Sequence, residues 1–156
     1  METLGHTSAF RHTTIRIESN QPTQFIDLTD EIETLVVESG IETGLVNIQT
    51  LHTTTAVIVN ELEPLLLADI AAMLESLAPR GAAYGHDNLS LRTVNCVLGE
   101  RPNGHSHCRA FLLSPSVSLN VIDGRVQLGR WQRVLLVELD GPRARDVSIL
   151  LLGAGR

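Results

Sequence analysis

The sequence predicts an α+β fold with a largely antiparallel β-sheet, and three kinds of pattern support this prediction. Two segments carry apolar residues at helical spacing, several runs are rich in β-branched residues, and short turn motifs join neighbouring runs into hairpins. The regular alternation of strands and helices that a doubly wound parallel sheet requires is absent. Hairpin-linked strands together with two main helices are typical of the α+β class.

The chain has 156 residues, which is the length of a single domain. Its hydrophobic fraction of 43% is enough for a core, and because aromatic residues make up only 3%, that core must consist mainly of aliphatic side chains. Neither an internal repeat nor a low-complexity tract divides the sequence. We therefore expect one domain over residues 1–156, with residues 1–10 flexible.

The first predicted helix covers residues 28–39. Its apolar stripe consists of Leu28, Ile32, Leu35 and Val36. We expect Thr29 or Asp30 to cap its start and Gly40 to end it in a left-handed conformation.

The second predicted helix covers residues 64–77, since Pro64 suits a first turn and Pro79 follows the end. The residues expected to form its buried stripe are Leu66, Ile70, Met73, Leu74 and Leu77. Residues 80–104 are rich in Gly, Asn, Asp, Pro and His, so we expect them to be mostly loop.

Strand-like patterns fill most of the remaining chain. Residues 11–18 alternate, with Thr13, Ile15 and Ile17 on one face, and residues 44–60 read as one β-branched strand. Residues 116–122 and 125–128 are predicted to form a hairpin around Asp123-Gly124. A turn at Asp140-Gly-Pro-Arg143 is predicted to separate strand-like residues 131–139 from residues 147–152.

The charge pattern excludes two classes of function. The formal net charge is −6 and all 12 basic residues are Arg, scattered along the chain, so the basic stripe of a nucleic-acid-binding protein is missing. Without any lysine, Schiff-base chemistry is excluded as well. We expect no nucleic-acid partner.

Cys96 and Cys108 have neither a C-x-x-C nor a zinc-knuckle spacing, so we interpret them as free thiols in a reducing compartment. The first residues lack the apolar region of a signal peptide, and the longest apolar runs are too short to cross a bilayer. We therefore expect a cytoplasmic protein without a membrane partner.

Histidines lie beside other polar residues near the ends of predicted strands. In residues 52–55, His52, Thr53 and Thr54 begin a polar interruption of an apolar strand that closes with Asn60 and Glu61. Burying such groups without partners is costly, and strand alternation places His52, Thr54 and Asn60 on one face. A polar site and a hydroxyl-rich edge strand both fit this pattern.

Two further segments supply imidazoles. In His86-Asp87-Asn88 a carboxylate can orient the imidazole, although the triplet taken alone favours a solvated turn. In residues 103–107, His105 and His107 project to the same side of an extended chain, whereas at the start of a helix they diverge and only one can serve a site.

Imidazoles together with Asp87 or Glu61 suit Zn²⁺ or another divalent ion such as Mg²⁺. No compact H-x-x-x-H spacing occurs, so the ligands, with His86 and His107 as metal candidates, would have to converge from distant segments. Hydrogen-bonded histidines without a metal are the alternative. Trp131 is expected to anchor the core, while Gln132 either reaches a ligand or satisfies backbone groups.

Separated motifs in this chain resemble those of the YjbQ family, whose members are described as secondary thiamine-phosphate synthases. The matching segments are His52-Thr-Thr-Thr-Ala56, Asn60-Glu61, Tyr84-Gly-His86-Asp87, Asn103-Gly-His-Ser-His107, Ile122-Asp-Gly-Arg-Val-Gln-Leu-Gly-Arg-Trp-Gln132 and Val137-Glu-Leu-Asp-Gly-Pro-Arg143. The resemblance implies a curved antiparallel sheet and a homotrimer with sites near the subunit boundaries.

The resemblance also implies an activity, the joining of a pyrimidine pyrophosphate to a thiazole phosphate with release of pyrophosphate. Because the sequence contains no P-loop or other glycine-rich diphosphate cradle, a side activity is an open interpretation. The residues expected in catalysis are His52, Glu61, His86, Asp87 and His107. Those expected to bind the small phosphorylated substrate are Thr53, Thr54, Asn60, Asn103, Arg130, Trp131 and Gln132.

Two residues depart from the family pattern. Arg130 replaces a small Thr, so a large cation there either recruits phosphate or obstructs the site, and Ser114 stands where Gly is common. Arg130 and Arg109 are the arginines expected to stabilise a leaving diphosphate. Two alternative functions are a metal-assisted hydrolase of a small phosphorylated metabolite and a non-catalytic trimer that binds a small anion.

Overall fold

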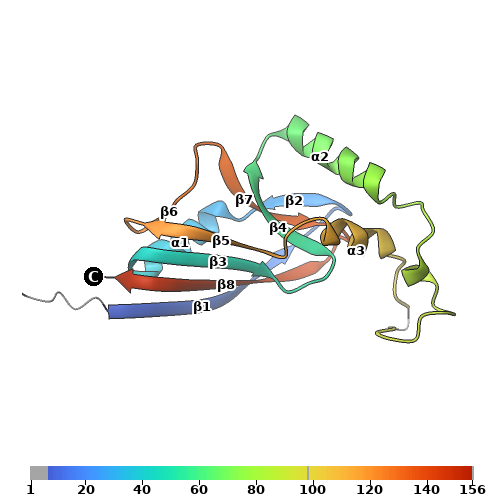
Figure 1. The fold of residues 1–156 in the computed structure, drawn as a ribbon, viewed down its shortest axis with the longest axis horizontal. Coiled ribbons are helices and arrows are strands. Elements are labelled where there is room, and N and C mark those ends of the chain that lie inside the picture. Colours follow the sequence, from blue (N-terminus) through green and yellow to red (C-terminus); the bar gives the residue numbers. More distant parts are fainter. Residues whose placement is uncertain (1–6, 98, 156) are drawn as a thin grey trace, which may run out of the picture.

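A computed structural model describes residues 7–97 and 99–155 of the chain (Figure 1). The strands are β1 Thr7–Glu18, β2 Gln24–Asp27, β3 Ile41–Thr50, β4 Thr55–Glu61, β5 Ser116–Ile122, β6 Arg125–Val126, β7 Gln132–Glu138 and β8 Ala144–Gly155. The helices are α1 Thr29–Ser39, α2 Pro64–Leu77 and α3 Gly104–Phe111, and a 3₁₀ turn, η1, lies at Gly85–Asp87.

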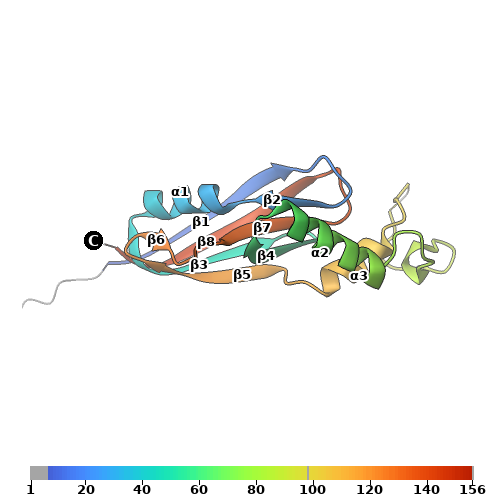
Figure 2. The same cartoon turned by 90° about the horizontal axis from the view of Figure 1, so that it is seen from above.

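The strands form two antiparallel sheets, which confirms the predicted α+β class. The larger sheet has the order β1-β8-β3-β5-β6, and the smaller has the order β2-β7-β4. Helix α1 lies beside the sheets at the end near β6, whereas α2 and α3 lie toward the opposite end (Figures 1 and 2). The third helix, α3, was not among the predicted helices, and it begins at Gly104, the last residue of the segment predicted as loop.

The main core lies between the two sheets and is closed by α1. Strand β7 contributes to both sides of the small sheet, because Val134 and Leu136 face the main core while Val137 packs with α2 and α3. Burial on both faces explains why this strand is a continuous apolar run. The second, smaller core consists of Ala56, Leu74, Val137 and Leu139.

Helix α2 has the predicted bounds, but its predicted buried stripe is wrong. Of that stripe only Leu74 is buried, while Met73 is 51% and Leu77 61% exposed. Leu74 and the partly buried Ile70 are the residues of this stripe that pack into the smaller core. Arg109 of α3 holds the end of α2, because its Nε donates to the Ala78 carbonyl at 2.9 Å and its guanidinium pairs with Glu75. Arg109 therefore has a structural role, which is to hold the end of α2 against α3.

Helix α1 is confirmed, with a different cap from the one predicted. Neither Thr29 nor Asp30 caps it. Instead, Asp27 Oδ1 accepts the Thr29 N–H at 2.9 Å. Gly40 ends the helix with φ 70°, as expected. Asp123 and Gly124 have φ 52° and 70°, which confirms the hairpin turn between β5 and β6.

The prediction of one strand over residues 44–60 is wrong. The chain turns at residues 51–54, so β3 belongs to the large sheet and β4 to the small one. The turn is closed by a hydrogen bond of 2.5 Å between the hydroxyl groups of Thr50 and Thr55. Strand alternation therefore does not apply to His52 and Thr54, which lie in the turn.

Residues 7–10 belong to β1 and pair with residues 152–155 of β8, while the flexibility of residues 1–10 stays a prediction. Residues 1–6 lie outside the described part of the chain. Among the described residues, no helix is long and apolar enough to cross a membrane.

Candidate functional site

A buried ion pair forms the floor of the candidate site, where β7 ends and β8 begins. Glu138 and Arg145 are 0% and 3% exposed, and both guanidinium contacts to the carboxylate measure 2.6 Å. Burial raises the pKa of Glu138, but the hydrogen bonds from Arg145, the Asp140 N–H and Ser19 outweigh it and hold that pKa below its usual value. Arg145 also donates to the Thr54 hydroxyl at 3.0 Å, which fixes the turn above it.

His52 has a defined hydrogen bond on one side of its ring. Its Nε2 accepts the Asp146 N–H at 2.8 Å, so the neutral ring carries its proton on Nδ1. Burial, followed by the nearby charge of Arg145, lowers the pKa of His52. The imidazole is therefore held neutral, as a hydrogen-bond donor through Nδ1.

His86 and His107 face each other across the site. Their ring centroids lie 4.5 Å apart, and His86 Nε2 is 3.9 Å from Glu100 Oε1. Burial, followed by the neighbouring His86, lowers the pKa of His107. His107 is therefore the histidine of α3 that serves the site, whereas His105 is buried and contacts Ser106 and Tyr84.

These residues line a polar hollow of about 450 Å³. The predicted residues that line it are His52, Thr53, Thr54, His86, Asn103 and His107, joined by Leu51, Arg92, Asn95, Glu100, Asp140, Arg143 and Arg145. A second hollow of about 640 Å³ shares His52, Thr53 and His107 and continues past Ala110, Phe111, Leu113 and Pro115. A polar and a more apolar compartment thus meet at two imidazoles.

Asp87 supports α3 and does not line the polar hollow. Its Oδ1 accepts the N–H groups of Asn103 and Gly104, both at 2.9 Å, at the start of the helix. A carboxylate in this position satisfies N–H groups that have no partner within the helix and complements its dipole. Asp87 thereby positions His107, and its predicted part in catalysis stays a prediction.

The other predicted residues lie at the far end of β4 and β7. There Asn60 pairs with Arg133 and the exposed Glu61 with Gln132 in the strand register. None of them lines the polar hollow of the same chain. The predicted catalytic set is therefore divided between two places.

Trp131 is 61% exposed, so its predicted role as a core anchor is wrong. The guanidinium of Arg130 stacks over its ring at 4.6 Å from the centroid, on the loop before β7. Gln132 accepts the Gly129 N–H at 2.8 Å and so satisfies the backbone of this loop. The carbonyl of Ser114 accepts the N–H of Val57 in β4. This bond uses backbone atoms only, so any residue type at position 114 can form it.

The described residues contain no group of three or more His, Cys, Asp or Glu side chains arranged to hold a metal ion. His86 and His107 supply two imidazoles, which is half of a tetrahedral zinc site. The residues present thus do not form a complete ligand set within one chain, and metal binding stays a prediction.

Sequence reasoning missed the charged residues that surround the histidines, namely Arg92, Glu100, Glu138, Asp140, Arg143 and Arg145. A signal for one of them was present, because Glu138 interrupts the apolar run from Val134 to Leu139 and a buried carboxylate requires a partner. Arg92 and Glu100 gave no comparable signal, since both belong to a loop without periodicity.

Fold and site together define a two-sheet α+β protein with a polar hollow walled by histidine and arginine. Comparison with known proteins gives the family: a profile described as UPF0047 protein YjbQ-like matches residues 13–154. The chain belongs to this YjbQ/UPF0047 family.

Relatives match over most of their length. UPF0047 proteins of Archaeoglobus fulgidus and Methanothermobacter thermautotrophicus are 40% and 36% identical; each match covers 88% of this chain, and 98% and 88% of the respective relative. The structure of a YbjQ-like protein of unknown function from Sulfolobus solfataricus is similar with a TM-score of 0.84 and 28% identity, over 94% of this chain and 99% of that one. A hypothetical protein from Aeropyrum pernix has a TM-score of 0.80 and 33% identity, over 92% and 98%.

Proposed function

We propose that this chain is a cytoplasmic transferase of the thiamine-phosphate synthase type, which acts on a small phosphorylated metabolite. The observation that carries the proposal is the meeting of His52, His86 and His107 in one polar hollow, although they come from three distant segments. Imidazole N–H groups beside arginines suit a reaction in which a diphosphate leaves.

The reaction breaks the bond between the exocyclic methylene carbon of the pyrimidine and a diphosphate oxygen, and the bonding electron pair stays with the diphosphate. The thiazole nitrogen then uses its lone pair to form the new carbon–nitrogen bond. His52 and His107 donate hydrogen bonds to the growing negative charge, and Arg143 adds positive charge from the wall of the hollow. The neighbouring hollow, with Phe111 and Leu113, offers an apolar surface for a ring.

We also propose that the protein acts as a homotrimer. The support is the division of the predicted site, because Glu61 and Gln132 lie at the far end of β4 and β7 from His52. In the proposed trimer, Glu61 and Gln132 of one subunit lie beside the His52 hollow of its neighbour. The experiment is a mixture of His107→Ala and Gln132→Ala subunits after co-refolding. Activity above that of either variant alone supports the shared site, and activity no higher than the two variants contradicts it.

The direct test measures thiamine phosphate formed by the purified protein from hydroxymethylpyrimidine pyrophosphate and thiazole phosphate. We expect His107→Ala to lower kcat by about 10²- to 10³-fold, the range for loss of one hydrogen-bond donor to a developing negative charge. His12→Gln is the matched control, because His12 lies on β1, bonded to Ser148, and should leave the rate unchanged.

Folded wild-type protein that makes no product contradicts the transferase. Phosphate release without the thiazole substrate, and only with a divalent ion present, would instead point to a metal-assisted hydrolase. Ligand binding without any turnover would point to a small-anion-binding protein.

A further inference from the structure

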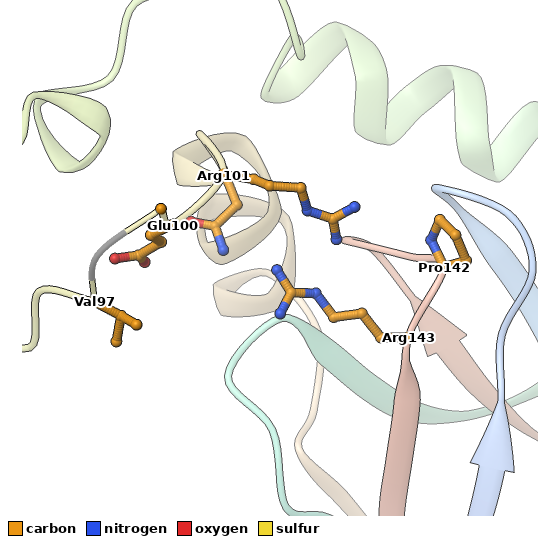
Figure 3. A pocket seen from close by; sticks show the side chains of 7 residues that line it. Val97, Glu100, Arg101, Pro142 and Arg143 are labelled. Carbon is orange, nitrogen blue, oxygen red and sulfur yellow. The ribbon is translucent and has the colours of Figure 1, made fainter.

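Two arginines that the sequence did not single out converge on one residue beside the histidine hollow. Arg101 donates from Nη2 to the Asp140 carbonyl at 2.8 Å, and Arg143 donates to the same carbonyl from Nε at 3.1 Å. Arg143 also pairs through Nη2 with Asp140 Oδ2 at 2.8 Å. In Figure 3 the Arg101 and Arg143 side chains extend toward each other from two different segments.

The positive charge here exceeds the negative charge. Of the nearby carboxylates, Glu100 already pairs with Arg92 at 3.0 Å, so Asp140 alone faces the two guanidinium groups. The contacts to Asp140 use Nη2 of Arg101 and Nε and Nη2 of Arg143, so among the described residues neither Nη1 group has a protein acceptor. Because both side chains are partly exposed, at 47% and 39%, these donors are accessible to a ligand.

The other arginines of this region are not available in the same way. Arg92 is 13% exposed and donates to Glu100, Val94 and Asn95, so it holds its own loop together. Arg145 is buried and bound to Glu138 and Thr54. Only Arg101 and Arg143, within the described part of this region, combine positive charge with accessible donors.

A second observation, independent of the charges, points to a ligand. Asn103 is 6% exposed, and its Oδ1 is a buried acceptor without a hydrogen-bond partner. The orientation of its amide is fixed because Nδ2 donates to Asp140 Oδ2, an oxygen that can only accept, at 3.0 Å. An unsatisfied buried acceptor is costly, and a ligand N–H or O–H would satisfy it.

We propose that Arg101 and Arg143 form a subsite for the diphosphate end of a ligand, and that the Asn103 oxygen beside them accepts a hydrogen bond from an N–H or O–H group of the same ligand. They line a hollow of about 520 Å³ that shares Glu100, Asn103 and Arg143 with the histidine hollow. A diphosphate held by the two guanidinium groups through paired N–H···O bonds leaves the rest of the ligand beside His52 and His107. This inference rests on the proposed function for its biological meaning, since it places the leaving group of that reaction.

Titration calorimetry with inorganic pyrophosphate, in the presence of a chelator, tests the subsite without requiring turnover. We expect the wild-type protein to bind, and Arg101→Gln and Arg143→Gln each to weaken binding by about ten- to a hundredfold, the range for loss of a charge-assisted hydrogen bond. Arg125→Gln removes the same charge from β6, at the other end of the large sheet, and should change the affinity less than twofold. Absence of wild-type binding, or equal weakening by Arg125→Gln, would overturn the proposal.

Two further measurements keep the result interpretable. Arg101→Lys retains the charge with a compact ammonium group, and we expect several-fold weaker binding because the planar fork is lost; unchanged affinity contradicts the paired geometry. Aminomethylenediphosphonate should bind several-fold more tightly than methylenediphosphonate, since its amino group can donate to Asn103 Oδ1. Equal affinities would remove Asn103 from the subsite.

The outcomes also separate this inference from the proposed function. Pyrophosphate binding that depends on Arg101 and Arg143, without thiamine phosphate formation, supports the subsite and contradicts the transferase. Product formation that neither arginine affects supports the transferase and overturns the subsite.

Discussion

The two ends of the β4–β7 strand pair carry similar residues in opposite environments. At the hollow, Thr55 lies opposite Glu138, whose carboxylate is fully buried and bound by Arg145. At the other end Glu61 lies opposite Gln132, and both are exposed. The same strand register thus presents a carboxylate as a structural element at one end and as a solvated group at the other. Glu138 is buried and Glu61 is exposed because different parts of the chain cover the two ends of the strand pair. The residue type alone does not predict this difference in burial.

Removing the cation at the buried end should have the largest effect. Arg145→Ala leaves Glu138 as an uncompensated buried charge, so we expect the free energy of unfolding to fall by about 3–5 kcal/mol. Urea denaturation monitored by circular dichroism measures it. Glu61→Gln, at the exposed end, is the matched control and should change stability by less than about 0.5 kcal/mol. Comparable losses for the two variants would show that the ends are alike.

An intermediate effect is expected from the carboxylate that caps α3. Asp87→Ala removes the acceptor for the N–H groups of Asn103 and Gly104, so the free energy of unfolding should fall by about 1–2 kcal/mol. Asp69→Ala, an exposed position on α2, is the control. NMR chemical shifts of the His107 ring should change in the first variant only. A variant with wild-type stability and an unmoved His107 signal would contradict the positioning role.

The smallest effect is a pH dependence from the buried histidines. Burial is the first cause that lowers the pKa values of His52, His105 and His107 in the folded chain. The unfolded chain therefore binds protons first, so their contribution is complete above the unfolded pKa of about 6.5 and is lost as pH falls below it. Urea unfolding at pH 7.5 and 5.5 should show lower stability at 5.5, with a smaller difference in His52→Asn. Equal stability at both values contradicts neutral burial.

Local chemistry made some elements predictable to the residue. Helix α2 begins at Pro64 as expected, and Glu63 caps it by accepting the N–H groups of Leu65 and Leu66. The turn at Asp123-Gly124 also follows from its own residues, because left-handed backbone angles are tolerated there. Such features require no distant partner.

The break at residues 51–54 was not predictable in the same way. The β-branched pattern of residues 44–60 continues across it, and what divides the strand is the packing of β3 and β4 into separate sheets. The exposure of Trp131 and of Leu77 likewise depends on which surfaces other elements cover, as does the burial of Arg145.

By itself, the sequence determined the α+β class, the helices around residues 29–39 and 64–77, and the polar segments that carry His52, His86 and His107. These depend on periodicity and turn residues, which act over a few positions. Only the tertiary structure decided that His107 and not His105 faces the hollow, that Asp87 caps α3, and that two arginines meet at Asp140. Those arrangements join segments far apart in the chain, and their energies depend on burial and on partners that local patterns do not encode.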